Sequence, residues 1–141
     1  MEIRNKKALF DYTVLKEYTC GIELLGTEIK SIRKGSVDLK DSYVVIKNGE
    51  CYALNIYIAK YEQGNIFNHD ERRTRKLLLH KAEIKKLYKL REEDGISIIP
   101  LSMFISNNYA KLKIGVCKGK KLYDKRQAIK EKDFEKMSRY N

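Results

Sequence analysis

Apolar and polar residues alternate along three parts of the chain, and this alternation predicts β-strands. It covers residues 8–25, 42–58 and 99–116, where aliphatic and aromatic side chains recur at every second position. Successive side chains of a strand point to opposite faces, so this pattern is typical of strands with one buried face. Residues 60–75 are polar instead and predict a long loop, of the kind that often carries function.

Turn residues divide the second and third of these parts into β-hairpins. Asn48 and Gly49 form the dipeptide that most strongly predicts a two-residue turn, because a type I′ turn needs a positive φ at both central positions. Asn107 and Asn108 mark a similar turn between two alternating runs. Pro100 has no amide hydrogen to donate, so its strand is expected to lie at an edge or to carry a bulge.

Two segments have the spacing of amphipathic helices. Thr27 is a candidate N-cap for a short helix whose isoleucines share one face, and Gly35 is its expected stop. Residues 81–93 predict a second helix, with an apolar face, exposed lysines on the other side and Gly95 as its end. The chain therefore combines several short strands with two short helices.

These elements predict a mainly β protein with short helices. About six antiparallel strands joined by hairpins suggest a small closed barrel of the OB type, which binds oligonucleotides on its strand faces and loops. The character changes after Val116, since residues 118–141 contain nine lysines and arginines but only four acidic residues. We expect an OB-like barrel over residues 1–122 and a basic tail over residues 123–141, disordered when free and helical on its partner.

The chain carries a formal net charge of +11 over 141 residues, which indicates an anionic partner. Nucleic acid is the first candidate, because each phosphate that a lysine or arginine neutralises releases counterions. An anionic membrane is the second candidate and simple solubility the third. No apolar run approaches the length of a membrane span, and the N-terminus lacks that of a signal peptide, so we expect a cytoplasmic protein.

Cysteines and histidines suggest no metal site and no catalysis. Cys20, Cys51 and Cys117 are odd in number, far apart and in no C-x-x-C pair, so we expect small buried residues. His69 is expected in a turn, and His80 at the start of the second helix, since no third ligand or partner lies near either in sequence. We predict a protein that is not an enzyme and that has no cofactor.

Basic residues gather in two parts of the predicted barrel. Alternation places Lys111, Lys113 and Gly115 on one exposed strand face, where a phosphate backbone could approach closely, and ordinary solvated lysines are the alternative. The basic run at residues 72–76 is a second candidate, because arginine binds phosphate through paired hydrogen bonds and stacks on bases. Such runs are also often only solvated.

The segment between barrel and tail is basic as well. Residues 115–121 contain two glycines and three lysines but lack the spacing of a phosphate-binding loop, so a flexible hinge is preferred to nucleotide hydrolysis. Tyr123 follows this hinge. An exposed aromatic ring at that place is suited to stacking on an unpaired base, and packing on the barrel is the alternative.

Several blocks of the sequence, taken in order, resemble the SmpB family of tmRNA-binding (SsrA-binding) proteins. They are residues 26–35 (GTEIKSIRKG), 39–43 (LKDSY), 61–65 (YEQGN), 75–81 (RKLLLHK), 115–126 (GVCKGKKLYDKR) and 129–131 (IKE). The likeness runs from about Asn5 to Asp133. No single block decides the matter, but their joint occurrence is highly specific.

The resemblance implies an OB-like fold and an RNA-binding adaptor without catalytic activity. Such an adaptor binds the tRNA-like domain of tmRNA and delivers it to stalled ribosomes, where trans-translation tags the stalled peptide and rescues the ribosome. The tail would occupy the empty decoding site and the mRNA channel. The implied partners are tmRNA (SsrA RNA), the small ribosomal subunit with its rRNA and, through the tmRNA complex, elongation factor Tu. The protein is expected to be a cytoplasmic monomer.

The resemblance also implies site residues. For tmRNA binding they are Asn5, Lys6, Lys7, Thr19, Lys76, Leu78, Lys111 and Lys113, and for contacts to the decoding site and mRNA channel they are Tyr123, Asp124, Lys125, Arg126, Ile129 and Lys130. Thr19 departs from the family, because many members carry there an acidic residue that contributes to tmRNA binding. Glu17 and Glu23 are candidates to compensate. Alternation puts Glu17 on the same face as Thr19, but neither residue lies at the same position.

Two other functions are open at this point. A nuclease or another RNA-processing enzyme would need clustered acids for a metal ion, or a positioned histidine, and the blocks supply neither. A basic ribosome-associated protein with a structural role fits the charge but leaves the ordered blocks unexplained. The two alternatives differ from the adaptor in the RNA that each would bind in a cell.

Overall fold

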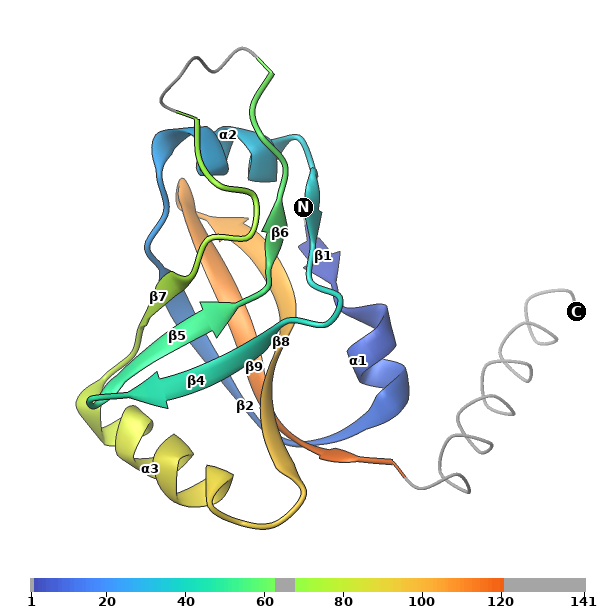
Figure 1. Cartoon of the computed structure of the whole chain (residues 1–141), viewed down its shortest axis with the longest axis vertical. Coiled ribbons are helices and arrows are strands. Elements are labelled where there is room, and N and C mark those ends of the chain that lie inside the picture. The colour runs from blue at the N-terminus through green and yellow to red at the C-terminus, as the bar shows by residue number, and fades with distance from the viewer. Residues whose placement is uncertain (1, 63–67, 121–141) are drawn as a thin grey trace, which may run out of the picture.

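The computed structural model describes residues 2–62 and 68–120. Seven strands form one antiparallel sheet in the order β1, β8, β9, β2, β7, β5, β4 (Figure 1). They are β1 (Glu2–Arg4), β2 (Tyr12–Ile22), β4 (Tyr43–Lys47), β5 (Glu50–Leu54), β7 (Arg75–Leu78), β8 (Ile96–Ser106) and β9 (Tyr109–Gly119). Two short strands, β3 (Val37–Asp38) and β6 (Tyr57–Ile58), pair with each other, and the helices of the described part are α1 (Lys6–Asp11), α2 (Gly26–Arg33) and α3 (Lys81–Arg91).

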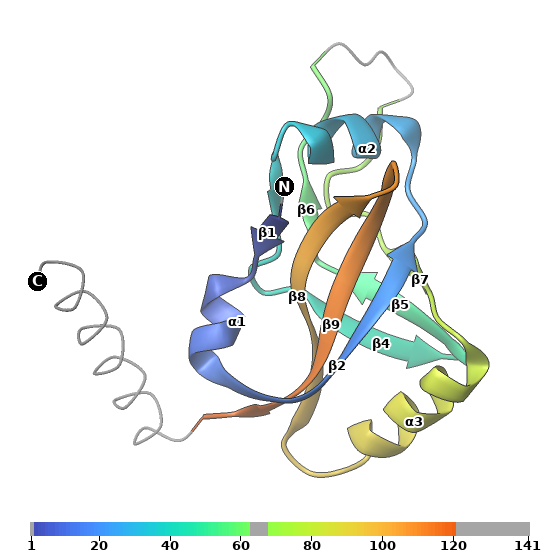
Figure 2. The same ribbon diagram turned by 180° about the vertical axis from the view of Figure 1, so that it is seen from behind.

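The large sheet curves strongly around the main hydrophobic core. α2 lies at one end of the curved sheet and α3 at the other (Figures 1 and 2). β4 packs beside β8, but no ladder joins the two strands in the described residues. The mainly β class with short helices is confirmed, and the expected closed barrel is corrected to an open curved sheet. β1 already occupies that edge of β8 at residues 102–104, so the edge is not free for β4.

The predicted alternation is clearest along β9. On β9 the even-numbered residues from Ala110 to Val116 are buried in the main core, whereas Lys111 and Lys113 are only half-buried on the other side. Leu87 of α3 and Ile32 of α2 close the two ends of this core. A residue two positions along a strand returns to the same face, which is why the sequence pattern located the core side of β9. On β8 the pairing shifts between Pro100 and Ser102, so Ile99 and Leu101 do not share the core face of Met103.

All three cysteines are free and buried, as expected. Burial raises the pKa of Cys20 to about 12, and it raises the pKa of Cys51 and of Cys117 to about 11. A thiol reacts chiefly as the thiolate, so these side chains act as small apolar residues of the core.

The predicted turns are confirmed by the backbone. Asn48 and Gly49 have φ values of 53° and 74°, and Asn107 and Asn108 have 50° and 66°. Both pairs therefore have the two positive φ angles that a tight hairpin turn needs. The pairing of β8 with β9 shifts between Pro100 and Ser102, which is the bulge expected where a proline cannot donate to the ladder.

Residues 8–11 are helical, which corrects the strand predicted over residues 8–25. Asn5 caps α1, because its side-chain oxygen accepts a hydrogen bond from the Ala8 amide. Its amide nitrogen donates to the carbonyls of Leu39 at 3.0 Å and Pro100 at 2.8 Å. The helix is thus stabilised by groups that are distant in sequence, and an alternating pattern read locally could not reveal them.

The start of α2 also differs from the prediction. Leu25, and not Thr27, is the N-cap, and the Glu28 carboxylate accepts a hydrogen bond from the Leu25 amide at 2.8 Å. Gly35 ends this helix as predicted, with a φ of 76°. The second helix ends at Arg91, two residues before the predicted end.

Candidate nucleic-acid interface

The outer face of strands β9, β2 and β7 brings together residues that are far apart in sequence. Gly21 of β2 lies opposite Lys111 on β9 and opposite Leu78 on β7, so these three residues form one row across the sheet. Thr19 lies opposite Lys113 in the neighbouring row. We call this region, with Lys76 of β7, the open half of the outer face. Figure 2 shows β9 and β2 running side by side on this side of the molecule.

Gly21 allows Leu78 to lie over the sheet in this row. A Cβ atom at Gly21 would be 3.3 Å from both the Cβ and the Cδ1 of Leu78, which is a tight contact. Leu78 itself is 50% exposed. An exposed leucine beside Lys111 offers an apolar contact to a sugar or base next to a cation for a phosphate.

Lys113 is paired with an acidic residue, but not with its direct neighbour. Its ammonium lies 3.8 Å from the carboxylate of Glu17, which is two residues before Thr19 on β2. Both side chains are partly exposed, so the pair contributes little stability and can exchange partners. Glu17 thus places a negative charge beside the position where Thr19 lacks one.

Lys76 lies at the β7 edge of the open half. Its ammonium is 3.7 Å from the carboxylate of Glu50 on β5, and its direct cross-strand neighbour is Tyr52. The ion pair is partly exposed. Lys76, Lys111 and Lys113 therefore present three partly exposed ammonium groups along one sheet face, which suits a phosphate backbone.

Gly115 does not extend the exposed face as expected. It is buried, and a Cβ atom there would be only 2.6 Å from the Cδ1 of Leu101. Leu101 occupies the bulge of β8 and packs with Ile99, Cys117 and Ala8 of α1 in a second small core. We call this region the covered half of the outer face. Phosphate cannot approach Gly115, because Leu101 covers it.

The basic arm at the start of α1 lies beside the covered half. Asn5 is 3% exposed, and its side chain is used in the hydrogen bonds that hold α1. Lys6 and Lys7 are exposed, and the Lys7 ammonium donates a hydrogen bond to Asp41 at 2.7 Å. The structure therefore divides the predicted tmRNA-binding residues into two groups, one on the open half and one around α1.

The basic run at residues 72–76 contains both a partly exposed candidate, Lys76, and arginines that hold the fold together. Arg75 is fully buried and donates to the Glu28 carboxylate and to the Ile56 carbonyl. Arg73 donates to the same carboxylate at 2.6 Å. Burial raises the pKa of Glu28, but the hydrogen bonds from Arg73, the Leu25 amide and Arg75 outweigh this and hold it below its ordinary value. Arg75 is thus structural and cannot contact RNA.

His69 is also structural. Its Nε2 donates to the Ile58 carbonyl at 2.9 Å, so its Nδ1 accepts from the Thr27 hydroxyl, also at 2.9 Å. The residue is buried and connects the segment after the polar loop to α2.

In the described part of the chain, no helix is long and apolar enough to cross a membrane.

Comparison with known proteins identifies the family. A sequence model of the family described as SmpB protein matches residues 2–140. The chain belongs to the SmpB family. An SsrA-binding protein from Staphylococcus aureus (strain N315) is 56% identical over 128 residues, which are 91% of this chain and 83% of that protein. One from Ligilactobacillus salivarius (strain UCC118) is 51% identical over 133 residues, 94% of this chain and 86% of that protein.

A solved structure is similar in fold as well as in sequence. It is described as "tmRNA-SmpB: a journey to the center of the bacterial ribosome", and the matching chain has a TM-score of 0.75 and 42% identity. The match covers 91% of this chain and 94% of that one. The family resemblance inferred from the sequence blocks is therefore confirmed.

Membership of the SmpB family does not by itself locate every functional side chain. Sequence reasoning did not single out Phe104, which lies opposite Lys111 on β8 and is half-buried at the border of the open half. The alternation of β8 was the available signal for it. The tail residues Tyr123, Asp124, Lys125, Arg126, Ile129 and Lys130, together with the domain boundary after residue 122, lie outside the described residues.

Proposed function

We propose that this SmpB-family protein is an RNA-binding adaptor of trans-translation. It binds the tRNA-like domain of tmRNA and delivers it to stalled ribosomes, so that the stalled peptide is tagged and the ribosome is rescued. The family assignment and the likeness to a chain described with tmRNA and the bacterial ribosome support this proposal. The protein acts by binding, without catalysis, cofactor or metal, as a monomer in the cytoplasm.

The row of Lys111, Gly21 and Leu78 carries the tmRNA-binding part of the proposal. The Lys111 ammonium neutralises a phosphate, while the exposed side chain of Leu78 packs on a sugar or an unpaired base. Lys76 and Lys113 lie on either side of the row and continue the phosphate contact. Thr19 donates a hydrogen bond in this interface, and Glu17 supplies the nearby negative charge.

The basic tail over residues 123–141 carries the ribosomal part. Tyr123 stacks near the decoding site, and Asp124, Lys125, Arg126, Ile129 and Lys130 enter the mRNA channel of the small subunit, where the tail becomes helical on rRNA. Elongation factor Tu joins through the tmRNA complex. The tail therefore takes the place of a codon–anticodon pair, and the folded domain holds the RNA.

The RNA that the full-length protein binds in cells tests the adaptor function. Protein is captured after crosslinking, and the bound RNA is sequenced. Strong enrichment of tmRNA over its cellular abundance is expected. Recovery of mostly ribosomal RNA or mRNA without tmRNA would contradict the adaptor and favour a structural ribosome-associated protein.

Removal of the tail tests the division between the two parts. A chain that ends after Leu122 should bind tmRNA with unchanged affinity but should not support peptide tagging in a reconstituted translation system. The full-length chain is the control in both assays. Tagging by the shortened chain would refute the role of the tail, whereas loss of tmRNA binding would refute the separation of roles.

A further inference from the structure

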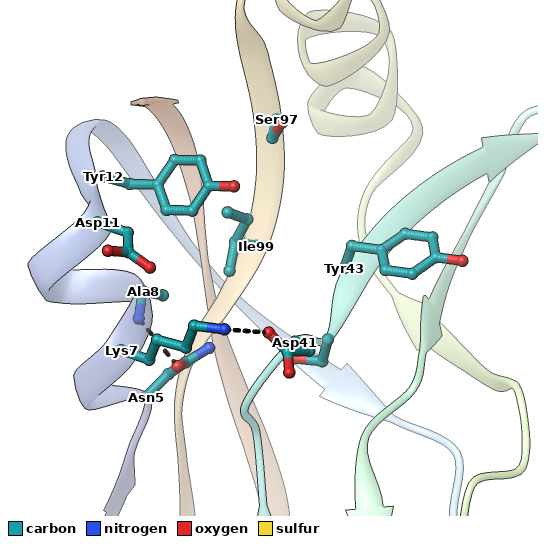
Figure 3. A pocket seen from close by; sticks show the side chains of 10 residues that line it. Asn5, Lys7, Ala8, Asp11, Tyr12, Asp41, Tyr43, Ser97 and Ile99 are labelled. Carbon is teal, nitrogen blue, oxygen red and sulfur yellow. Dashed lines mark hydrogen bonds and ion pairs between the residues drawn. The ribbon is translucent and has the colours of Figure 1, made fainter. Parts of the chain in front are cut away.

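A pocket of about 260 Å³ lies between α1, the start of β4 and the start of β8. Figure 3 shows Lys7 reaching across it to Asp41, with the Tyr12 ring directed toward Ile99 and the Tyr43 ring directed away from both. This volume is close to the lower limit of about 300 Å³ for small-molecule pockets, which favours a single planar group as the occupant. We call it the α1 pocket.

One wall of the α1 pocket presents a donor and an acceptor next to each other. The Lys7 ammonium and the Asp41 carboxylate are 2.7 Å apart, and each side chain is about half exposed. The hydrogen bond and charge of Asp41 raise the pKa of Lys7, and those of Lys7 lower the pKa of Asp41. Both groups are therefore charged at neutral pH, and each has hydrogen-bonding capacity left for a ligand.

The backbone holds Asp41 in an uncommon conformation at this wall. Its φ is 61°, in the left-handed region, which few residues other than glycine, asparagine and aspartate adopt. Asn55, with a φ of 64°, donates to the Asp41 carbonyl at 3.0 Å, and Arg72 donates to the Asn55 side chain at 3.0 Å. Two successive contacts thus hold the backbone at Asp41, and the Lys7 ammonium holds its carboxylate; backbone held in an uncommon conformation is a pattern found at binding sites.

The groups around the α1 pocket match the parts of a nucleobase. Proteins recognise unpaired bases by stacking them on aromatic rings and by hydrogen bonds to their Watson–Crick edges. Tyr12 supplies a ring and Ile99 supplies an apolar wall. Guanine alone among the four bases has two neighbouring donors, N1–H and N2–H, for the two oxygens of a carboxylate, and its O6 beside them accepts from an ammonium.

We propose that the α1 pocket binds one unpaired guanine of the RNA, with N1–H and N2–H donated to Asp41 and O6 accepting from Lys7. This inference rests on the RNA-binding function proposed above. Lys40 precedes Asp41 in the chain, and Arg72 is linked to Asp41 through Asn55, so both cations lie near the base and favour the phosphates that flank it. The basic arm at α1 thereby recognises a base, while the open half binds the phosphate backbone of the RNA.

Short RNAs test the inference without tmRNA. Pentamers of uridine with a central guanosine, inosine or adenosine are titrated into the full-length protein, and the amide signals of Tyr12, Asp41 and Tyr43 are followed by NMR. Inosine lacks only the N2 amino group. The guanosine pentamer should bind on the order of tenfold more tightly than the other two, as expected for loss of a bidentate contact. Equal affinities for all three RNAs would overturn the proposal.

The variant Asp41→Asn separates charge from backbone shape. Asparagine also adopts positive φ, so the fold is retained, but its amide accepts only one of the two donors. The guanosine preference should disappear in this variant and persist in Asp94→Asn, which makes the same charge change on the loop after α3. Persistence in Asp41→Asn would refute the assigned contact.

Two further measurements complete the test. Guanosine monophosphate that binds as tightly as the guanosine pentamer would show a free nucleotide site and overturn the assignment to RNA. Binding of the tRNA-like domain of tmRNA is measured in parallel. Loss of base preference with intact tmRNA binding refutes the pocket alone, whereas base preference without tmRNA binding refutes the adaptor function alone.

Discussion

The open and covered halves of the outer face both include residues of β9, but they differ in use. In the open half, Gly21 makes room for Leu78, which remains exposed beside lysines. In the covered half, Gly115 makes room for Leu101, which is buried under α1. The comparison teaches that alternation reveals which side of a strand faces away from the core, but not whether that side stays accessible to a partner.

Shortening the two leucines should separate the halves most strongly. Leu101→Ala should lower the free energy of unfolding by about 2–5 kcal/mol, because it leaves a cavity in the second core. Leu78→Ala should change it by less than about 1 kcal/mol, since an exposed side chain loses little burial. Urea unfolding of both variants measures this difference.

The two leucine variants should rank in the reverse order for RNA binding, where Leu78→Ala has the larger effect. At a temperature where both are folded, Leu78→Ala should weaken binding to the tRNA-like domain of tmRNA, whereas Leu101→Ala should not. Equal weakening in the two variants would mean that the covered half also contacts RNA.

Adding one methyl group to each glycine should give a smaller contrast. Gly115→Ala places a Cβ 2.6 Å from the buried Leu101 side chain and should cost about 1–3 kcal/mol of stability through overpacking. Gly21→Ala meets Leu78 at 3.3 Å, where the exposed side chain can move, and should cost less than Gly115→Ala. Thermal unfolding checks the order, and a larger loss for Gly21→Ala would contradict it.

Removing one ammonium group from the open half should affect binding and leave stability nearly unchanged. Lys111→Ala should weaken tmRNA binding several-fold and reduce the slope of log affinity against log salt by about 1, as expected for one phosphate contact. Lys85→Ala on the exposed side of α3 is a control that removes the same charge elsewhere. An unchanged slope for Lys111→Ala would show that this lysine does not contact a phosphate.

The smallest expected effect concerns the position of Thr19. Thr19→Glu places a carboxylate directly opposite Lys113, and a cross-strand charge pair contributes roughly 0.2–1 kcal/mol. Glu17→Gln should weaken tmRNA binding by removing the existing charge, and Thr19→Glu in the same chain should restore it. Binding titrations of the single and double variants test this exchange. Failure to restore binding would mean that the position of the charge matters as well as its sign.

The sequence predicted the hairpins because their determinants are local. Asn48–Gly49 and Asn107–Asn108 require positive φ angles wherever they occur in a tight turn, and Pro100 lacks a donor in any strand. The same locality explains the failures. α1 is stabilised through Asn5 by carbonyls 34 and 95 residues away, so the first strand was predicted too long.

The candidate site was predicted in part. Alternation placed Lys111 and Lys113 on one face, but the register that brings Leu78 beside them depends on β2 pairing with both β9 and β7. The basic run at residues 72–76 was a candidate for RNA contact, but its Arg75 is buried. Arg75 meets Glu28, which lies 47 residues earlier in the chain, and no local pattern connects the two.

The place of β2 in the strand order has a consequence for the synthesis of the protein. Residues 12–21 pair with residues 111–119, so the open half cannot assemble until β9 has left the ribosome that makes it. Contacts so distant in sequence form late and slow the folding of a chain. A copy of this protein whose own translation stopped before Tyr109 would therefore lack the surface proposed to bind tmRNA, and a damaged message would yield no partly active adaptor.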